Sequence, residues 1–317
     1  MTDFKLFFAT DIHGSDVCWK KFINSAKFFD CQVLVMGGDM TGKMLVAIVD
    51  IGGGRYRVRL AGTDRVVRRD ELDALRKLIA DSGYYPYDTN PDEIAALESD
   101  RGAVDRLFQS KMTETLERWF QIADERLAGT DIKVYLGPAN DDPPFIDEIL
   151  ARSGGRVENP ESRVVELPAG WRMISCGWSN PTPWDSPREL PEAALTELIE
   201  TEVARLDTME RAIFNLHVPP KDSQLDKAAL LNADLSPVTQ AGAPVLAGVG
   251  SSAVREAIER HQPPLALHGH IHESRGAVKI GRTLCINPGS EYGDGILRGA
   301  IVTLSERGIT RHQLLAG

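Results

Sequence analysis

The stretch Leu267-His268-Gly269-His270-Ile271-His272 places two imidazole side chains, His270 and His272, on either side of one residue just after a glycine. The apolar run before it, 264–267, predicts a buried strand that ends at this turn. Past the end of a strand the side chains no longer alternate strictly, so both rings can face one space. Neutral imidazole is the commonest metal ligand in proteins. A His-x-His pair alone is more typical of ordinary surface histidines, so its meaning depends on the rest of the chain.

Polar side chains also follow four other short apolar runs. Residues 5–9, 33–36, 132–136 and 212–216 each predict a buried strand. The residues that follow these runs are, in order, Asp11 with His13, Asp39, Asn140 and His217. Because ligands bind beyond the carboxyl ends of strands in α/β sheets, we expect all these side chains to meet at one edge.

The seven candidate donors offer only oxygen and nitrogen atoms, which suits manganese, iron or zinc. They are too many for one tetrahedral ion. They suffice for two ions that share one carboxylate and keep positions open for water and substrate. We therefore predict two divalent transition-metal ions as cofactors.

Composition sets the broad class of the protein. The 317 residues are 42% hydrophobic and 26% charged, with a net charge of −10, and they can form one large domain with an insertion. An acidic chain is a poor general binder of nucleic acid or of anionic membranes. The four cysteines are not closely paired, and the chain shows neither a leader peptide nor an apolar run that could span a bilayer. We expect a cytoplasmic protein with reduced thiols and a small phosphorylated substrate; the oligomeric state stays open.

Residues of about 41–102 form a predicted insertion after the second strand. Runs 45–51 and 55–60 flank a Gly-Gly-Gly turn and predict a hairpin, and 70–82 has helical spacing. An aromatic loop is expected at 83–87, before a long helix over 102–127. Gly37 to Lys43 matches the spacing of a phosphate-binding P-loop, but Met44 stands where that motif needs Ser or Thr, so we reject this interpretation.

The second strand of this hairpin carries Arg55, Arg57 and Arg59 at alternate positions, which puts the three on one face. Residues 43–70 hold seven basic and three acidic side chains, a net charge of +4 within an acidic chain. Alternation alone is typical of a solvated strand face. The local change of sign favours the alternative, a basic lid whose arginines contact an anionic substrate.

The other elements expected are alternating helices and strands. The helices span 19–29, 191–206 and 252–260, and a hairpin is predicted from 163–167 and 172–176. Runs 277–280, 283–287, 300–305 and 309–314 predict a β-rich tail with glycine turns.

The ordered pattern Asp-x-His, Gly-Asp, Gly-Pro-Ala-Asn, His and Gly-His-x-His, from Asp11 to His272, resembles the signature of the calcineurin-like metallophosphoesterases. The chain looks most like the prokaryotic predicted phosphoesterases of that superfamily. The resemblance implies an α/β fold: a four-layer α/β/β/α sandwich of two mixed sheets, the metallo-dependent phosphatase fold, here with an inserted hairpin-plus-helix subdomain.

The resemblance also implies roles by position. Asp11, His13, Asp39 and His272 would hold one metal, and Asp39 would bridge to a second, whose remaining ligands are Asn140, His217 and His270. Asn140 is also expected to contact substrate, and His217 and Asp141 are the candidate catalytic residues. In most of the family a histidine follows the asparagine and serves the leaving group, whereas Asp141 stands here. An ionised aspartate has no proton to donate.

The implied activity is hydrolysis of a phosphoester, a phosphodiester or nucleotide-like substrate, by a metal-bridging hydroxide. Two alternatives remain: a non-catalytic protein-interaction module on the same fold, and a metal-dependent nuclease. Interaction modules tend to lose metal ligands, whereas every ligand position is filled here. The acidity of the chain argues against a long nucleic-acid footprint.

Overall fold

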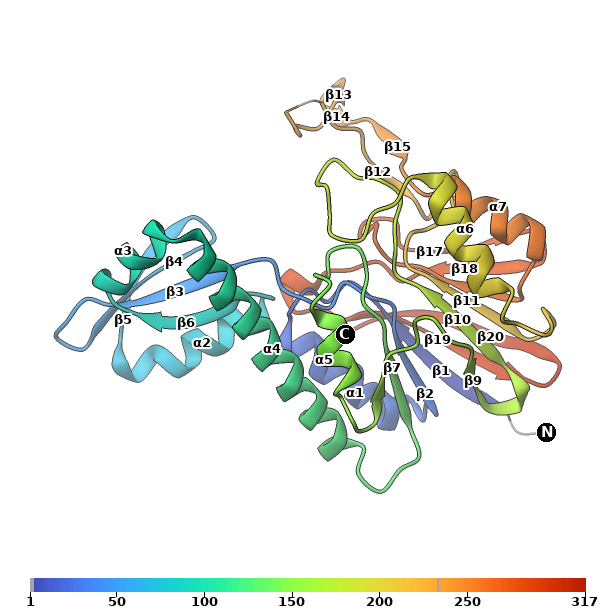
Figure 1. The fold of residues 1–317 in the computed structure, drawn as a ribbon, viewed down its shortest axis with the longest axis horizontal. Helices are drawn as coiled ribbons and strands as arrows, with labels where there is room; N and C mark the ends of the chain where they lie inside the picture. Colours follow the sequence, from blue (N-terminus) through green and yellow to red (C-terminus); the bar gives the residue numbers. More distant parts are fainter. Residues whose placement is uncertain (1–2, 233) are drawn as a thin grey trace.

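The computed structural model describes residues 3–232 and 234–317 and is built around two six-stranded mixed sheets (Figure 1). The first sheet has the order β20-β19-β1-β2-β7-β8. Its parallel strands are β1 (Phe4–Ala9), β2 (Val33–Met36), β7 (Lys133–Leu136) and β8 (Val157–Glu158). Antiparallel β19 (Arg298–Ser305) and β20 (Gly308–Ala316) complete one edge.

The second sheet has the order β17-β18-β16-β11-β10-β9. The parallel strands are β10 (Arg172–Cys176), β11 (Ala212–Leu216), β16 (Leu265–Leu267) and β18 (Thr283–Asn287). Antiparallel β9 (Val165–Glu166) and β17 (Gly276–Ile280) lie at its two edges. Each sheet thus has parallel strands at its centre, and these central strands carry the predicted metal ligands beyond their carboxyl ends.

The two sheets share one apolar cluster, and each sheet packs its other face on helices. Strand β1 shows why: Phe4, Leu6 and Phe8 join the cluster that includes the second sheet's Met173, whereas Phe7 faces the helices. This division follows from the period of two along a strand. The first sheet packs on α1 (Asp16–Phe29), α4 (Arg101–Arg126) and α5 (Ile146–Ala151), and the second packs on α6 (Glu192–Val203) and α7 (Ser252–His261).

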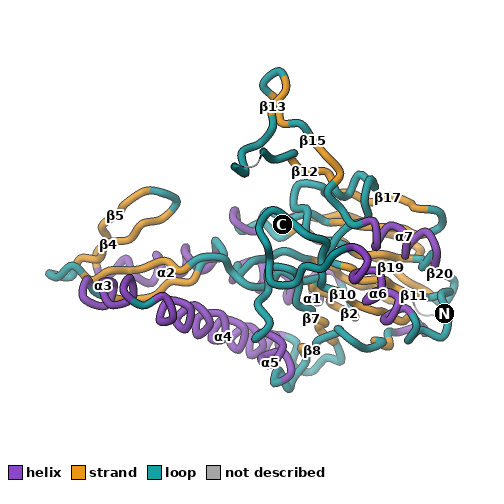
Figure 2. The backbone as a smooth tube through the Cα atoms, turned by 45° about the horizontal axis from the view of Figure 1, so that its top comes forward, coloured by secondary structure: helices purple, strands orange, loops and turns teal. Residues whose placement is uncertain are grey.

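The insertion forms a separate small sheet with the order β5-β4-β3-β6, which stands apart from the main body in Figures 1 and 2. It consists of β3 (Leu45–Asp50), β4 (Arg55–Leu60), β5 (Thr63–Arg68), α2 (Leu72–Asp81), β6 (Tyr85–Thr89) and α3 (Pro91–Ser99). One face packs on α2 through an apolar cluster that includes Ile48, Val58, Leu75 and Ile79. Helix α4 leads the chain back to the main body (Figure 2).

Short elements complete the fold. Two small hairpin-like sheets, β12 (Lys227–Ala229) with β15 (Leu246–Gly248) and β13 (Thr239–Gln240) with β14 (Ala243–Pro244), project from the main body. The 3-10 helices are η1 (Arg69–Glu71), η2 (Pro168–Gly170) and η3 (Tyr292–Asp294). The described helices are all too short or too polar to cross a membrane.

The structure corrects the expected aromatic loop at 83–87. Tyr85–Thr89 is strand β6, which pairs parallel to β3. Strand β6 is an edge strand of the inserted sheet, a position where a proline such as Pro86 is tolerated. Strand β5 and helix α3 were not predicted at all. The predicted hairpin strands, the long helix and the apolar core strands are confirmed to within a few residues.

Candidate metal centre

The carboxyl ends of five central strands, three from one sheet and two from the other, converge on one place. The loops after β1, β2 and β7 supply Asp11 with His13, Asp39 and Asn140. The ends of β11 and β16 supply His217 and the pair His270 and His272. Residues far apart in the sequence therefore meet beyond the carboxyl ends of the strands, as the sequence pattern predicted.

The candidate ligand atoms form three neighbouring groups, each with atoms within 4.8 Å of one another. The first is Asp11, His13 and His272, the second is Asp39, His217 and His270, and the third, His13, Asp39 and Asp141, links the other two. In the first, His272 Nε2 lies 3.3 Å from Asp11 Oδ1; in the second, His217 Nε2 lies 3.4 Å from Asp39 Oδ2. Asn140 Oδ1 lies 2.8 Å from His270 Nδ1, so all seven predicted residues meet. These adjoining groups are consistent with a dimetal site.

Four of the seven residues have a left-handed backbone, which is uncommon for residues other than glycine. The φ angles are 54° at Asp11, 38° at His13, 51° at Asp39 and 66° at His270. Such conformations cost on the order of 1–3 kcal/mol each and cluster at functional sites, where surrounding structure enforces them. Four of the fourteen non-glycine residues with positive φ in the described part of the chain are thus predicted ligands.

Two glycines allow the loops to approach each other closely. A Cβ on Gly269 would lie 2.2 Å from Thr10 Oγ1 and 2.3 Å from Asp11 Oδ2. A Cβ on Gly38, whose φ is 115°, would lie 2.2 Å from the Cβ of Ala139. Both positions therefore require glycine, which explains the glycines that precede Asp39 and His270 in the motif.

One nitrogen that faces the carboxylates, His217 Nε2, lacks a hydrogen-bond partner among the described residues, which is consistent with a bound cation. His217 Nδ1 donates to the carbonyl of Gly37 at 2.9 Å, which turns Nε2 toward the carboxylates. Both His217 Nε2 and His13 Nδ1 are buried without a hydrogen-bond partner among the described residues. A buried polar atom left unpaired costs about 1–3 kcal/mol, and a coordinated cation would remove that cost at His217 Nε2. The donor set therefore fits metal ions.

The protonation states of the side chains in the centre also fit bound metal ions. Burial lowers the pKa of His270 to about 3 and that of His13 well below its usual value, so both rings stay neutral, the form that binds metals. Burial also lowers the pKa of His217, but the carboxylates of Asp39 and Asp11 outweigh it and raise the pKa to about 10. Two buried carboxylates that draw a proton onto a neighbouring imidazole need positive charge, which metal ions would supply.

Several residues around the centre were not predicted. Asp142 is fully buried and accepts hydrogen bonds from the backbone N–H groups of Met40, Thr41 and Ala139, which ties the loops after β2 and β7 together. The Tyr292 ring packs against His13, with ring centroids 4.7 Å apart. Neither residue belongs to a short motif, so only the folded chain reveals them.

Lys43 and Ser186 also reach the centre unpredicted, through Asp141. Lys43 Nζ lies 2.5 Å from Asp141 Oδ2, and Ser186 Oγ donates to Oδ1 at 2.9 Å. Burial raises the pKa of Asp141, but the Lys43 charge and these hydrogen bonds outweigh it and hold the pKa below its usual value. Asp141 is therefore an ionised acceptor here. His268, next to the ligand motif, donates from Nδ1 to the carbonyl of Leu216 at 2.7 Å and so braces the end of β11.

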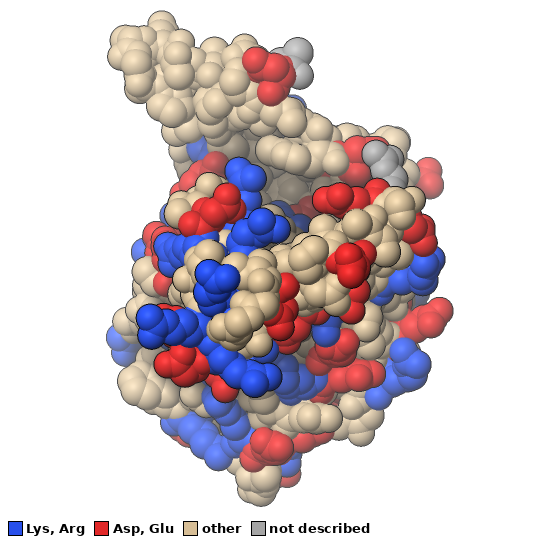
Figure 3. All heavy atoms as spheres, turned by 90° about the vertical axis from the view of Figure 1, so that its left-hand side faces the viewer, with Lys and Arg blue, Asp and Glu red and all other residues tan. Residues whose placement is uncertain are grey.

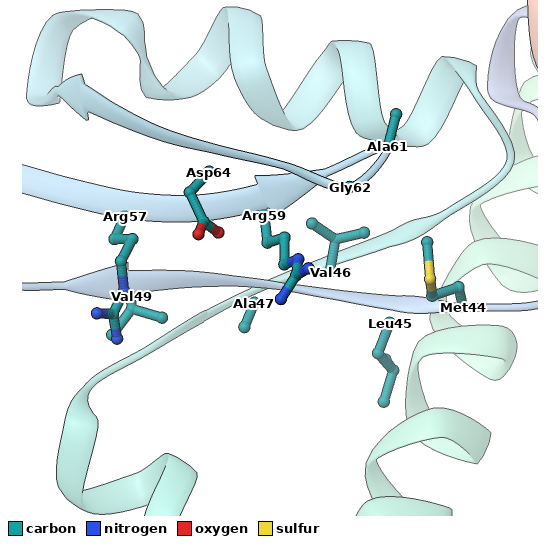
Figure 4. Close-up of a pocket in the computed structure, with 10 residues that line it drawn as sticks. All are labelled: Met44, Leu45, Val46, Ala47, Val49, Arg57, Arg59, Ala61, Gly62 and Asp64. Carbon is teal, nitrogen blue, oxygen red and sulfur yellow. The ribbon is translucent and has the colours of Figure 1, made fainter.

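The predicted substrate arginines lie elsewhere. Arg55, Arg57 and Arg59 are exposed on β4, in the inserted sheet, and Arg57 and Arg59 line a pocket of about 400 Å³ there with Asp64. Figure 4 shows both side chains extending from β4 toward Val49 and Ala47 of β3. Figure 3 shows basic side chains gathered on this end of the molecule, interspersed with acidic ones. Among the described contacts none joins these arginines to the metal centre, and their role stays a prediction.

Comparisons with known proteins agree with this fold. No family model matches the chain. An uncharacterized protein of Methanocaldococcus jannaschii is 29% identical over 180 residues, which cover 56% of this chain and 71% of the relative. One solved structure superposes with a TM-score of 0.57 at 16% identity, covering 100% of this chain and 99% of that one. A protein of Thermus thermophilus superposes with a TM-score of 0.52 at 12% identity, with the same coverage.

The structural neighbours also include metallophosphoesterases. A dimetal phosphatase from Danio rerio matches with a TM-score of 0.43 at 8% identity, over 99% of this chain and 98% of that one. The structure is a mixed α/β fold with several mixed sheets, a fold shared with the two solved structures at TM-scores of 0.57 and 0.52, and it encloses clusters of His and Asp.

Proposed function

We propose that this protein is a dimetal-dependent phosphoesterase that hydrolyses a phosphoester, with a phosphodiester or nucleotide-like substrate as the favoured class. The observation that carries the proposal is the convergence of seven oxygen and nitrogen donors, in adjoining groups, at the ends of five strands. Strained backbone at four of these residues and unpaired buried nitrogens support it.

The proposal includes the finer fold assignment. The apolar cluster shared by the two sheets, with helices packed on their outer faces, supports a four-layer α/β/β/α sandwich of the metallo-dependent phosphatase type. The inserted unit within 41–102 would then be a cap subdomain, supported by its own sheet and its own apolar cluster.

Each residue of the centre has a proposed task. Asp11, His13 and His272 would hold one cation, His217, His270 and Asn140 the other, and Asp39 would serve both. When bound, two such cations supply a water of lowered pKa and offset charge on the phosphoryl oxygens. The backbone N–H of His270 donates to both carboxylate oxygens of Asp11, at 3.0 and 3.1 Å, and so orients that carboxylate for its cation.

Asp141 would not serve as the proton donor to the leaving group. Its carboxylate already accepts from Lys43, Ser186 and Asn140 Nδ2. Since general acid help is typically worth about 10²–10⁴ in rate, alkyl phosphoesters should react slowly. Aryl esters, whose leaving groups need little protonation, should react faster.

The test combines metal analysis with hydrolysis. Protein purified with added manganese should contain two metal ions per chain and hydrolyse bis(p-nitrophenyl) phosphate or p-nitrophenyl phosphate, and a chelator should abolish this activity. Full metal loading without hydrolysis of either ester, or of nucleotides and cyclic nucleotides, would favour a protein-interaction module. Selective cleavage of DNA that weakens steeply with salt would favour the nuclease.

A further inference from the structure

The insertion supplies a cation, the Lys43 ammonium, beside the metal centre. We infer that Lys43 contacts the phosphoryl group of the substrate and that Asp141 is its positioning residue. This inference rests on the proposed phosphoesterase function and adds to it a substrate-contacting residue that lies outside the ordered ligand motif.

Asp141 joins Lys43 to the metal centre. Lys43 Nζ pairs with Asp141 Oδ2 at 2.5 Å, while Ser186 Oγ and Asn140 Nδ2 each donate to Oδ1 at 2.9 Å. The backbone N–H of Asp141 donates to Asp39 Oδ1 at 3.0 Å, so Asp141 directly borders the predicted bridging carboxylate. Because these hydrogen bonds fix the Asp141 carboxylate, the ion pair fixes the position of the Lys43 ammonium.

The ammonium of Lys43 keeps donors free for a ligand. Its side chain is 49% exposed, whereas that of Asp141 is 22% exposed, so the pair faces solvent on the lysine side. An ammonium has three N–H donors, and Asp141 is the one ion-pair partner of Lys43 among the described residues. Lys43 also acts electrostatically on the centre: burial lowers the pKa of His13 most, and the Lys43 charge lowers it further.

Two segments of the insertion pack closely against the centre, the loop before β3 and the turn between α2 and β6, and they define the position of Lys43. Gly42 N–H donates to the Tyr85 hydroxyl at 2.7 Å, and a Cβ on Gly42 would lie 2.3 Å from the carbonyl oxygen of Gly83. A Cβ on Gly83 would in turn lie 2.4 Å from the carbonyl oxygen of His13. The segment that enters the inserted sheet and the turn between α2 and β6 therefore lie directly against the ligand loop.

The chemistry of a fixed ammonium at this place suits a phosphoester. It would donate to a non-bridging phosphoryl oxygen and offset the negative charge on it, with no covalent bond formed and no proton lost. A dianionic monoester gains more from such a charge than a monoanionic diester, so Lys43 should matter more for monoesters. The insertion would thereby influence which phosphoesters are accepted.

The test uses full-length manganese-loaded protein and the variants Lys43→Gln, Lys43→Arg and Asp141→Asn. Lys133→Gln is the matched control, because Lys133 is 50% exposed and pairs with Glu158 at 2.6 Å, at the opposite end of β7 from Asn140. We expect Lys43→Gln to lower kcat/KM for p-nitrophenyl phosphate on the order of 10–100-fold, the usual worth of a hydrogen bond to a charged group. The loss on bis(p-nitrophenyl) phosphate should be smaller.

Three further readouts separate contact with substrate from a structural role. Metal content should stay at the wild-type level, the dissociation constant of inorganic phosphate should rise, and Lys43→Arg should recover part of both losses. Asp141→Asn should weaken phosphate binding less than Lys43→Gln does, and the double variant should be no worse than Lys43→Gln. Lys133→Gln should change none of these quantities.

The inference is overturned if Lys43→Gln keeps phosphate affinity and kcat/KM within twofold of wild type, or if it loses metal. Failure of the proposed function looks different: wild-type protein with two metals would hydrolyse none of the esters. Phosphate binding to metal-loaded protein, measured by calorimetry, would then still decide whether Lys43 contacts a phosphoryl oxygen.

Discussion

The metal centre and the inserted sheet both contain polar or charged residues that the sequence pattern predicted to be functional. In the metal centre these side chains are buried, whereas on the inserted sheet they are exposed to solvent. In the centre Asp11, His13 and Asp39 are buried on left-handed backbone, and nitrogens lack partners among the described residues. On the inserted sheet Arg57 and Arg59 are exposed on a regular strand. Burying polar groups without partners is costly, whereas a solvated arginine costs nothing. The construction of the centre is therefore consistent with bound metal ions, whereas the exposed arginine face gives no such indication.

Asp39→Ala should have the largest effect, because Asp39 is the carboxylate proposed to serve both cations, and it groups with His217 and His270 on one side and with His13 on the other. Activity should vanish, and metal content should fall at both sites rather than at one. Inductively coupled plasma mass spectrometry of the purified variant measures this directly. Asp105→Ala, an exposed aspartate on α4, is the control and should keep two metals. Normal metal stoichiometry in Asp39→Ala would disprove the shared role.

Gly269→Ala tests whether the close packing of the ligand loops matters. The added Cβ would collide with Thr10 and Asp11, so the loop must shift, and overpacking of this kind typically costs about 1–3 kcal/mol. We expect a lower thermal midpoint and weaker metal binding. Gly293→Ala is the matched control, because a Cβ there meets nothing within 4 Å. Equal behaviour of the two variants would mean that the loops tolerate more space than the structure indicates.

The sequence could predict a residue of these two regions when that residue directly follows an apolar strand. It could not predict residues that tertiary packing alone brings together. The ligands follow apolar strands at fixed order, so their meeting at one sheet edge could be expected from strand-end geometry alone. Lys43, Ser186 and Tyr292 reach the centre only through tertiary packing, and no spacing rule connects Lys43 with Asp141. Strand β6 contains Pro86, which an edge strand tolerates, and edge position is a property of the assembled sheet that the local sequence does not reveal.

Ile79→Ala tests whether the inserted sheet is energetically separate from the centre. Ile79 is fully buried in a cluster made only of insertion residues, and such truncations cost about 2–5 kcal/mol. Hydrogen exchange should accelerate over β3 to β6 while β1, β2 and metal content stay unchanged. The same truncation at Ile23, in the core beneath the first sheet, should accelerate exchange in β1 and β2 as well. Loss of metal in Ile79→Ala would show that the two regions fold as one unit.

Reversing the charge of the arginine face should have the smallest effect on the centre. The double variant Arg57→Glu with Arg59→Glu removes the positive face of β4 but touches neither the insertion's apolar cluster nor any candidate ligand. Exposed charges act over roughly a Debye length, about 8 Å at physiological salt, so metal content and thermal midpoint should not change. If the arginines guide or hold an anionic substrate, as the alternation and local charge predict, KM should rise for every anionic ester while kcat stays constant. That rise should shrink when salt is added, because screening weakens exposed charges most. An unchanged KM at low salt would leave the face as solvated surface, and Lys43 as the insertion's contribution to the site.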